Sequence, residues 1–167
     1  MELLTHSTTV NVGGGLQKER ERVYATPVYY GQSITRSLAG GFPLPIELSC
    51  GTYSTDREFG EIPPLRDVPL IDAMAVKKGD DELVLLLVHR AAHVGTIKVG
   101  VRIDGFMAHS EGEVVSLAGD TWHARNTLSI PDRIVPKRSS IEIVDGRCFL
   151  LGLSPFSLVR VSLKKNG

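Results

Sequence analysis

The chain has 167 residues, of which 42% are hydrophobic and 23% charged, an ordinary composition for a globular domain that buries a core. Nineteen basic side chains balance nineteen acidic ones, so the sequence lacks the basic excess that favours nucleic-acid or membrane-surface partners. No apolar run approaches the roughly 18 residues of a membrane span, and residues 1–12 lack the pattern of a signal peptide, which favours a cytoplasmic location.

The first 42 residues predict a strand-like start, a glycine loop and a helix. Residues 1–10 begin apolar and turn polar, and the glycines at 13–15 follow. These glycines lack the lysine-serine continuation of a phosphate-binding P-loop, so a tight turn is favoured. The alternating charges at 18–23 are typical of a solvated face.

A helix is predicted between Thr26 and Leu38. Thr26 suits the N-cap position, and the proline that follows it suits the first helical position. Tyr30, Ile34 and Leu38 recur every four residues and form one apolar stripe. Two glycines and a proline then end the helix.

Residues 43–69 are rich in proline and predict an irregular connector that lies against a larger body. A short strand is expected at 45–50, whereas Pro63 and Pro64 exclude a helix. Cys50 and Cys148 are too few for a disulfide framework, and we expect two buried thiols.

Residues 70–163 predict β structure throughout. A continuous apolar run at 84–88 indicates a central strand that is covered on both faces. Ile97, Val99 and Val101 alternate with other residues, so they should share one face. The predicted strands are two within 70–90 around Gly79, one each within 95–104 and 112–119, a hairpin over 141–153 that turns at Asp145-Gly146, and one at 157–165. This pattern predicts a mainly β, jelly-roll-like β-sandwich of antiparallel strands with an N-terminal strand-loop-helix extension.

The search for chemistry yields no catalytic residue, metal ligand or cofactor site. His89 and His93 are four residues apart, but along a strand that spacing is about 13 Å, too far to share a metal. There is no G-x-S-x-G elbow, and no carboxylate pair has a context that singles it out. Trp122, the one tryptophan, is either an aromatic platform for a sugar or a plug at the end of the sandwich, and we favour the plug.

The segment 117–163 resembles the C-terminal end of family 51 glycoside hydrolases that are α-L-arabinofuranosidases. In that family a strand ends in Leu-x-Gly, a polar turn leads into Pro-Asp-x-Val-x-Pro, and a hairpin and a final strand follow. The matching residues here are Leu117, Gly119, Ala124, Asn126, Thr127, Pro131, Asp132, Val135, Pro136, Leu153, Pro155, Ser157 and Leu163. Two departures are Arg125, where a histidine is expected, and Ser154-Pro155-Phe156, which replaces Pro-Pro-His.

The polar connector at 123–136 joins two expected strands and has a structural role in this interpretation. Asn126, Thr127 and Asp132 can satisfy backbone groups of a long crossing, and the prolines fix its path.

The resemblance also covers the front of the chain. It implies that residues 1–42 are a remnant of the last βα unit of a (β/α)8 barrel and that residues 43–167 are a β-sandwich accessory domain. Barrel active sites lie at the C-terminal ends of the strands, so His6 and Asn11 are expected at the active-site rim of a complete barrel. Trp122 is the one expected aromatic sugar contact.

In the resembled family the acid/base glutamate follows an asparagine on the fourth barrel strand, and the nucleophile ends the seventh. This sequence contains no Asn-Glu dipeptide, so the chain is expected to be a non-catalytic part of a retaining enzyme that removes terminal arabinofuranosyl residues. The expected partners are the catalytic barrel of the same enzyme, an arabinose-containing glycan and a second copy of the chain.

Two alternatives remain: an independent carbohydrate-binding module, and an oligomerisation module. Without the barrel, the helix stripe of Tyr29, Tyr30, Ile34 and Leu38 should form an exposed apolar patch.

Overall fold

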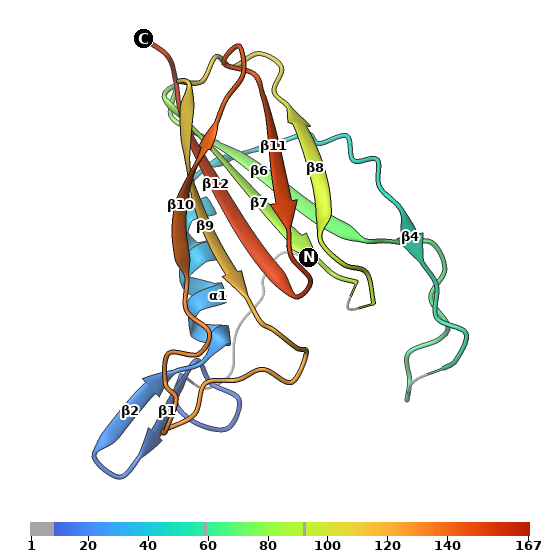
Figure 1. Ribbon diagram of the computed structural model, residues 1–167, viewed down its shortest axis with the longest axis vertical. Coiled ribbons are helices and arrows are strands. Elements are labelled where there is room, and N and C mark those ends of the chain that lie inside the picture. The colour runs from blue at the N-terminus through green and yellow to red at the C-terminus, as the bar shows by residue number, and fades with distance from the viewer. Residues whose placement is uncertain (1–8, 59, 92) are drawn as a thin grey trace.

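Figure 1 shows the computed structural model of the chain, which describes residues 9–58, 60–91 and 93–167. Its main feature is a six-stranded antiparallel sheet in the order β10-β9-β12-β7-β6-β3. These strands are β3 (Phe42–Leu44), β6 (Ile71–Lys78), β7 (Glu82–His89), β9 (Glu111–Ala118), β10 (Lys137–Glu142) and β12 (Ser157–Lys164). The chain is therefore mainly β, as predicted.

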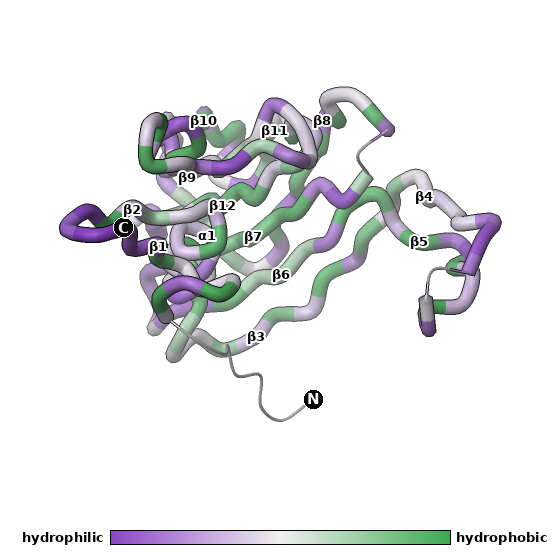
Figure 2. Tube along the Cα trace, turned by 90° about the horizontal axis from the view of Figure 1, so that it is seen from below, coloured by the Kyte–Doolittle hydropathy of each residue, from purple (hydrophilic) through white to green (hydrophobic). Residues whose placement is uncertain are grey.

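A second layer, the antiparallel pair β8 (Ile97–Arg102) and β11 (Cys148–Leu153), packs across the core from this sheet (Figures 1 and 2). The side chains of Leu83, Leu85 and Leu87 alternate along β7 and point into this core. Leu153 and Val161 enter from the two layers and are fully buried. Two layers with one core between them make the β-sandwich that the strand pattern predicted.

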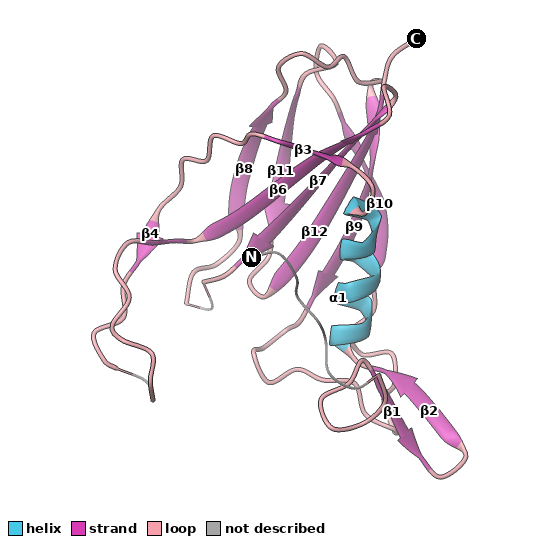
Figure 3. Ribbon diagram, turned by 180° about the vertical axis from the view of Figure 1, so that it is seen from behind, coloured by secondary structure: helices cyan, strands magenta, loops and turns pink. Residues whose placement is uncertain are grey.

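The outer face of the six-stranded sheet carries a second apolar cluster, and helix α1 (Pro27–Thr35) covers it (Figure 3). Ile34 is 4% exposed and packs with Leu86, Val115 and Leu117, which lie on β7 and β9. The apolar run at 84–88 is therefore covered on both faces, as predicted. Burying Ile34 contributes on the order of 2 kcal/mol to folding.

The predicted exposed patch on this helix is wrong. Tyr30 and Leu38 pack partly buried against the same cluster as Ile34, and Tyr29 is the member of the four-residue stripe that is exposed, at 43%. The reason is that the outer sheet face is itself apolar, so the helix stripe finds its partner within the chain. A short 3-10 helix, η1 (Arg36–Leu38), continues from α1 and brings Leu38 onto the sheet.

Two local predictions about strands are also wrong. Residues 45–50 form no strand, and short strands flank them instead: β3, and β4 (Thr52–Tyr53), which pairs with β5 (Val68–Pro69). The turn at Asp145-Gly146 exists, but only the bridge between Val144 and Cys148 joins its two sides. Before the turn β10 joins the large sheet, and after it β11 pairs with β8. The dipeptide therefore makes a corner between the two layers instead of a hairpin.

Neither thiol is buried as expected. Cys50 is half-buried and Cys148 is exposed, and both are free. The reason for Cys148 is its position in register, because Phe149 and Leu151 take the core-facing places of β11. Within the described residues, no helix is long and apolar enough to cross a membrane.

Candidate functional site: a polar groove beside the β1–β2 hairpin

The alternating charges at 18–23 belong to a hairpin of β1 (Leu16–Glu19) and β2 (Arg22–Ala25), which extends beyond the end of the sandwich (Figures 1 and 3). Its register pairs Gln17 with Tyr24 and Glu19 with Arg22. Directly paired residues share one face of a hairpin, so these four side chains form a polar face. The segment is solvated, as predicted, and its tip is strongly hydrophilic (Figure 2).

The base of the hairpin is closed by the glycine loop. The backbone N–H and the hydroxyl of Thr26 both donate to the carbonyl oxygen of Gly15, at 2.8 and 3.0 Å. Thr26 therefore occupies the predicted N-cap position, but its hydroxyl makes no capping hydrogen bond to the helix. A Cβ on Gly15 would lie 3.0 Å from Cβ of Tyr29, so the glycine permits close packing against α1.

Asn126 attaches the connector at 123–136 to this hairpin. Its side chain is 4% exposed, and its Nδ2 donates to the carbonyl oxygens of Ala25 and Ile134, both at 2.9 Å. Its Oδ1 accepts from the N–H of Ile134 at 2.8 Å. One buried carboxamide thus satisfies backbone groups in two segments, which confirms the structural role predicted for it.

The neighbouring connector residues form a turn whose polar groups face the hairpin. Thr127 and Ile130 exchange backbone hydrogen bonds, and the hydroxyl of Thr127 also accepts from the N–H of Ile130 at 3.2 Å. The hydroxyls of Thr127 and Ser129 are 3.1 Å apart. Nη2 of Arg22 donates to the carbonyl oxygen of Leu128 at 3.2 Å, so the hairpin and the turn are joined on a second side.

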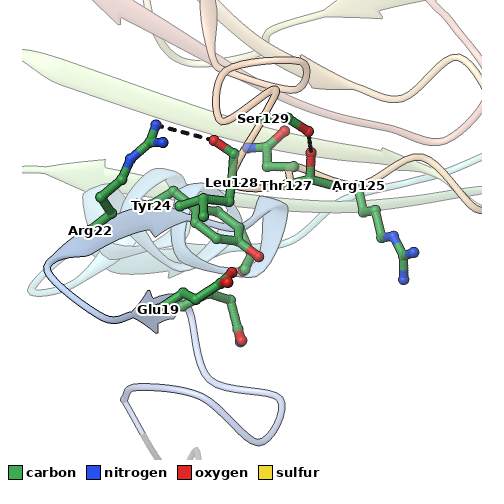
Figure 4. Close-up of a pocket in the computed structure, with 10 residues that line it drawn as sticks. Glu19, Arg22, Tyr24, Arg125, Thr127, Leu128 and Ser129 are labelled. Atoms are coloured by element: carbon green, nitrogen blue, oxygen red, sulfur yellow. Dashed lines mark hydrogen bonds between the residues drawn. The ribbon is translucent and has the colours of Figure 1, made fainter.

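A groove of about 660 Å³ lies between the hairpin and the turn (Figure 4). In this view the Tyr24 ring lies between Arg22 and Arg125, with Glu19 beneath it. The groove is lined by the four residues of the polar hairpin face, by Thr26, and by residues 125–129 of the connector. Among the described residues, no hydrogen bond or ion pair engages the side chains of Glu19, Tyr24 or Arg125, so their polar groups are free to bind a ligand.

Trp122 lies elsewhere, and the prediction that it plugs the sandwich is wrong. Its side chain is 73% exposed, and its ring stacks on that of His123 with centroids 3.5 Å apart. Trp122 lines a second hollow of about 370 Å³ beside Pro27 and Phe156, whose walls are mostly apolar. Leu117, Ala124 and Ile134 fill the sheet end that the tryptophan was expected to cover.

An ion pair fixes the other end of the connector. Nη2 of Arg133 donates to both carboxylate oxygens of Asp120, at 3.0 and 2.7 Å. The hydrogen bond from Arg133 holds the pKa of the Asp120 carboxyl below its usual range. The pair anchors the connector, and it lies outside the groove lining.

The two histidines considered as metal ligands diverge. His89 is 3% exposed; its Nδ1 accepts from the N–H of Ala91 and its Nε2 lies 3.0 Å from the carbonyl oxygen of Gly95. Because Nδ1 accepts from Ala91, the donor toward the carbonyl oxygen of Gly95 is Nε2. His93 instead contacts the ring of Tyr53. No group of three metal-binding side chains occurs among the residues that the structure describes.

Two residues are expected at an active-site rim, and the structure describes one of them. His6 lies outside the described residues. Asn11 lies in the glycine loop, with its backbone in the left-handed region at φ 57° and its Oδ1 accepting from the N–H of Lys18 at 2.8 Å. Asn11 therefore helps to hold the hairpin, and its place at a rim stays a prediction.

The hairpin itself was missed by sequence reasoning. Its turn is formed by Arg20 and Glu21, with Arg20 at φ 53°, so no Asn-Gly or Asp-Gly dipeptide marks it. Leu16 and Val23 stand at the two ends of the polar run 17–22, and no other signal for the hairpin remained. No motif indicated Arg125 or Tyr24 as functional candidates, since Arg125 lies in the connector and Tyr24 lies on β2, a strand that was not predicted.

Comparisons with known proteins agree with this architecture. A family model described as the alpha-L-arabinofuranosidase C-terminal domain matches residues 8–157. No curated protein sequence matches.

Among solved structures, the α-L-arabinofuranosidase of Thermotoga maritima superposes with a TM-score of 0.81 at 22% identity, covering 95% of this chain and 33% of that one. The GH51 α-L-arabinofuranosidase of Thermotoga petrophila RKU-1 superposes with a TM-score of 0.77 at 23% identity, covering 92% of this chain and 32% of that one. The GH51 arabinofuranosidase of Xanthomonas axonopodis pv. citri superposes with a TM-score of 0.79 at 20% identity, covering 94% of this chain and 30% of that one.

The chain thus spans about a third of the length of these enzymes, and the likeness shows the fold. The family match includes the hairpin, helix α1, the connector and the strands of the sandwich that precede β12. The chain belongs to the α-L-arabinofuranosidase C-terminal domain family.

Proposed function

We propose that this chain is the non-catalytic C-terminal part of an α-L-arabinofuranosidase that removes terminal arabinofuranosyl residues from plant polysaccharides or oligosaccharides. The observation that carries the proposal is the family match over residues 8–157, together with the coverage of about a third of arabinofuranosidase chains. In this proposal the partner is the catalytic barrel of the same enzyme. Residues 1–42 are its last βα unit, and residues 43–167 are the accessory domain.

Asp80 and Asp120 show the opposite of the pKa shift that a catalytic acid needs. Hydrolysis of a glycoside by a retaining enzyme needs a nucleophile and an acid whose pKa is raised. The pKa values of the Asp80 and Asp120 carboxyls are lowered, by Lys77 and Arg133 respectively. Both are exposed at the surface in ion pairs, which is unsuited to donating a proton to a leaving group.

In this assignment helix α1 connects the barrel to the sandwich. It lies on the outer face of the six-stranded sheet, so a barrel that contains this helix would rest against the same face. His6 and Asn11, which precede the helix, would then stand at the barrel's active-site rim. Met74 on this face is 54% exposed, and a barrel would cover it.

The experiment that tests the non-catalytic role is an assay of the purified chain with a chromogenic α-L-arabinofuranoside. We expect no release above a heat-inactivated control. Release that scales with chain concentration and survives further purification would show that carboxylates of this chain perform hydrolysis, and would overturn the proposal.

A further inference from the structure

We propose that the groove between the β1–β2 hairpin and residues 125–129 binds an uncharged, hydroxyl-rich oligosaccharide. The two sides of the groove come from segments about a hundred residues apart in sequence, held together by the buried side chain of Asn126. A hydrogen bond from Arg22 to the carbonyl oxygen of Leu128 joins them again. The groove is thus a built feature of the fold, with fixed walls before any ligand binds.

The lining matches the hydrogen-bonding capacity of a sugar. Each sugar hydroxyl donates one hydrogen bond and accepts others, so its site needs donors and acceptors side by side. Arg125 offers donors, Glu19 offers acceptors, and the carboxamide of Gln17 offers both. The half-buried Tyr24 ring, which lies between Arg22 and Arg125 in Figure 4, provides an apolar surface on which the C–H groups of a sugar ring can pack.

The charge pattern selects a neutral ligand over an anionic one. Glu19 stands opposite Arg22 in the hairpin register, so a carboxylate lies on the same face as the guanidinium. Nη2 of Arg22 is already engaged by the carbonyl oxygen of Leu128. An anion in the groove would have to approach the Glu19 carboxylate, whereas sites for phosphate or carboxylate ligands bring several donors together and keep carboxylates away.

This inference adds a glycan contact to the proposed accessory role, and the choice of arabinose as the test sugar rests on the proposed function. The hairpin belongs to the segment that precedes α1, so in a complete barrel it would stand with the βα loops that surround the active site. A groove at this place would hold part of a polymer chain away from the bond that is cut.

The test is a titration of the ¹⁵N-labelled chain with linear arabinotetraose, followed by amide chemical shifts. We expect saturable shifts at residues 17–24 and 125–129. Tyr24→Ala and Arg125→Ala should each weaken binding about tenfold, whereas Tyr24→Phe, which keeps the ring, should stay within about threefold of wild type. Lys18→Ala, on the opposite face of the same hairpin, is the matched control and should change affinity less than about twofold.

Three outcomes would overturn the inference: no saturable shifts with any neutral tetrasaccharide, shifts confined to the hollow at Trp122, or equal losses in the groove variants and in Lys18→Ala. Preferential binding of a galacturonic acid tetramer, weakened by salt, would also contradict it, because it would indicate an anion site. Binding of cellotetraose or xylotetraose but not of arabinotetraose would keep the groove as a glycan site and count against the proposed function instead.

Discussion

Replacing Asn126 by alanine tests whether this buried side chain attaches the connector to the hairpin. The change removes three hydrogen bonds and leaves the N–H of Ile134 without a partner in a buried place, since Ile134 is 5% exposed. An unsatisfied buried donor costs about 1–3 kcal/mol, and each carbonyl that loses one partner costs about 0.5 kcal/mol. Asn126→Ala should therefore lower the free energy of unfolding by about 2–4 kcal/mol.

The assay is equilibrium unfolding in urea, monitored by circular dichroism, at pH 7. Ser129→Ala is the matched control, because its exposed hydroxyl contacts only that of Thr127, and it should change stability by less than about 0.5 kcal/mol. If Asn126→Ala falls within about 0.5 kcal/mol of the wild type, the carboxamide does not hold the two segments, and the account of the groove's construction is wrong.

Three further predictions follow from burial and charge. Ile34→Ala should lower the free energy of unfolding by about 2–4 kcal/mol, because the side chain is 4% exposed between α1 and the sheet; a urea midpoint equal to that of the wild type would show that the helix does not pack there. Arg133→Ala should raise the pKa of the Asp120 carboxyl toward its usual value and leave that of Asp80 unchanged, as measured by NMR titration of the carboxyl carbons. Because the Asp120 pKa is lowered in the folded state, the pair stabilises the fold above the ordinary carboxyl pKa, and this contribution is lost as the pH falls through the lowered value. Trp122 is the chain's one tryptophan and is 73% exposed, so the native fluorescence should resemble that of solvated indole and be readily quenched by acrylamide; a blue-shifted, protected emission would contradict its exposure.

The sequence was sufficient to predict a strand and its buried face where one residue pattern extends along the strand. The apolar alternation at Ile97, Val99 and Val101 determines which face of β8 is buried, and the run at 84–88 identifies the doubly covered strand. The stripe of helix α1 was read correctly as apolar. The surface that the helix packs against was not predicted. The strands β7, β9 and β12 carry apolar residues on both faces, and the sequence does not show which face meets the helix.

The candidate site was harder to predict than the fold, for a physical reason. Its walls meet through one long-range hydrogen bond, from Asn126 to the carbonyl oxygen of Ala25, 101 residues away. Local reasoning identified Asn126 as a residue that satisfies backbone groups, and this was right for Ile134. The contact with Ala25 depends on the packing of two layers and a helix, which no local spacing encodes. Trp122 was also difficult to place from the sequence. Its size suggested burial at the end of the sheet, but smaller side chains fill that position.

In the proposed function, this chain completes a catalytic barrel without supplying the catalytic carboxylates. The most direct measurement is complementation: the barrel of the enzyme is produced without this region, and hydrolysis of a chromogenic α-L-arabinofuranoside is measured with and without the added chain. A barrel that lacks its last βα unit leaves sheet edges open, so we expect little activity from either part alone and restored hydrolysis when they are combined. Hydrolysis by the chain alone, or a barrel whose activity and stability do not respond to the chain, would contradict the account.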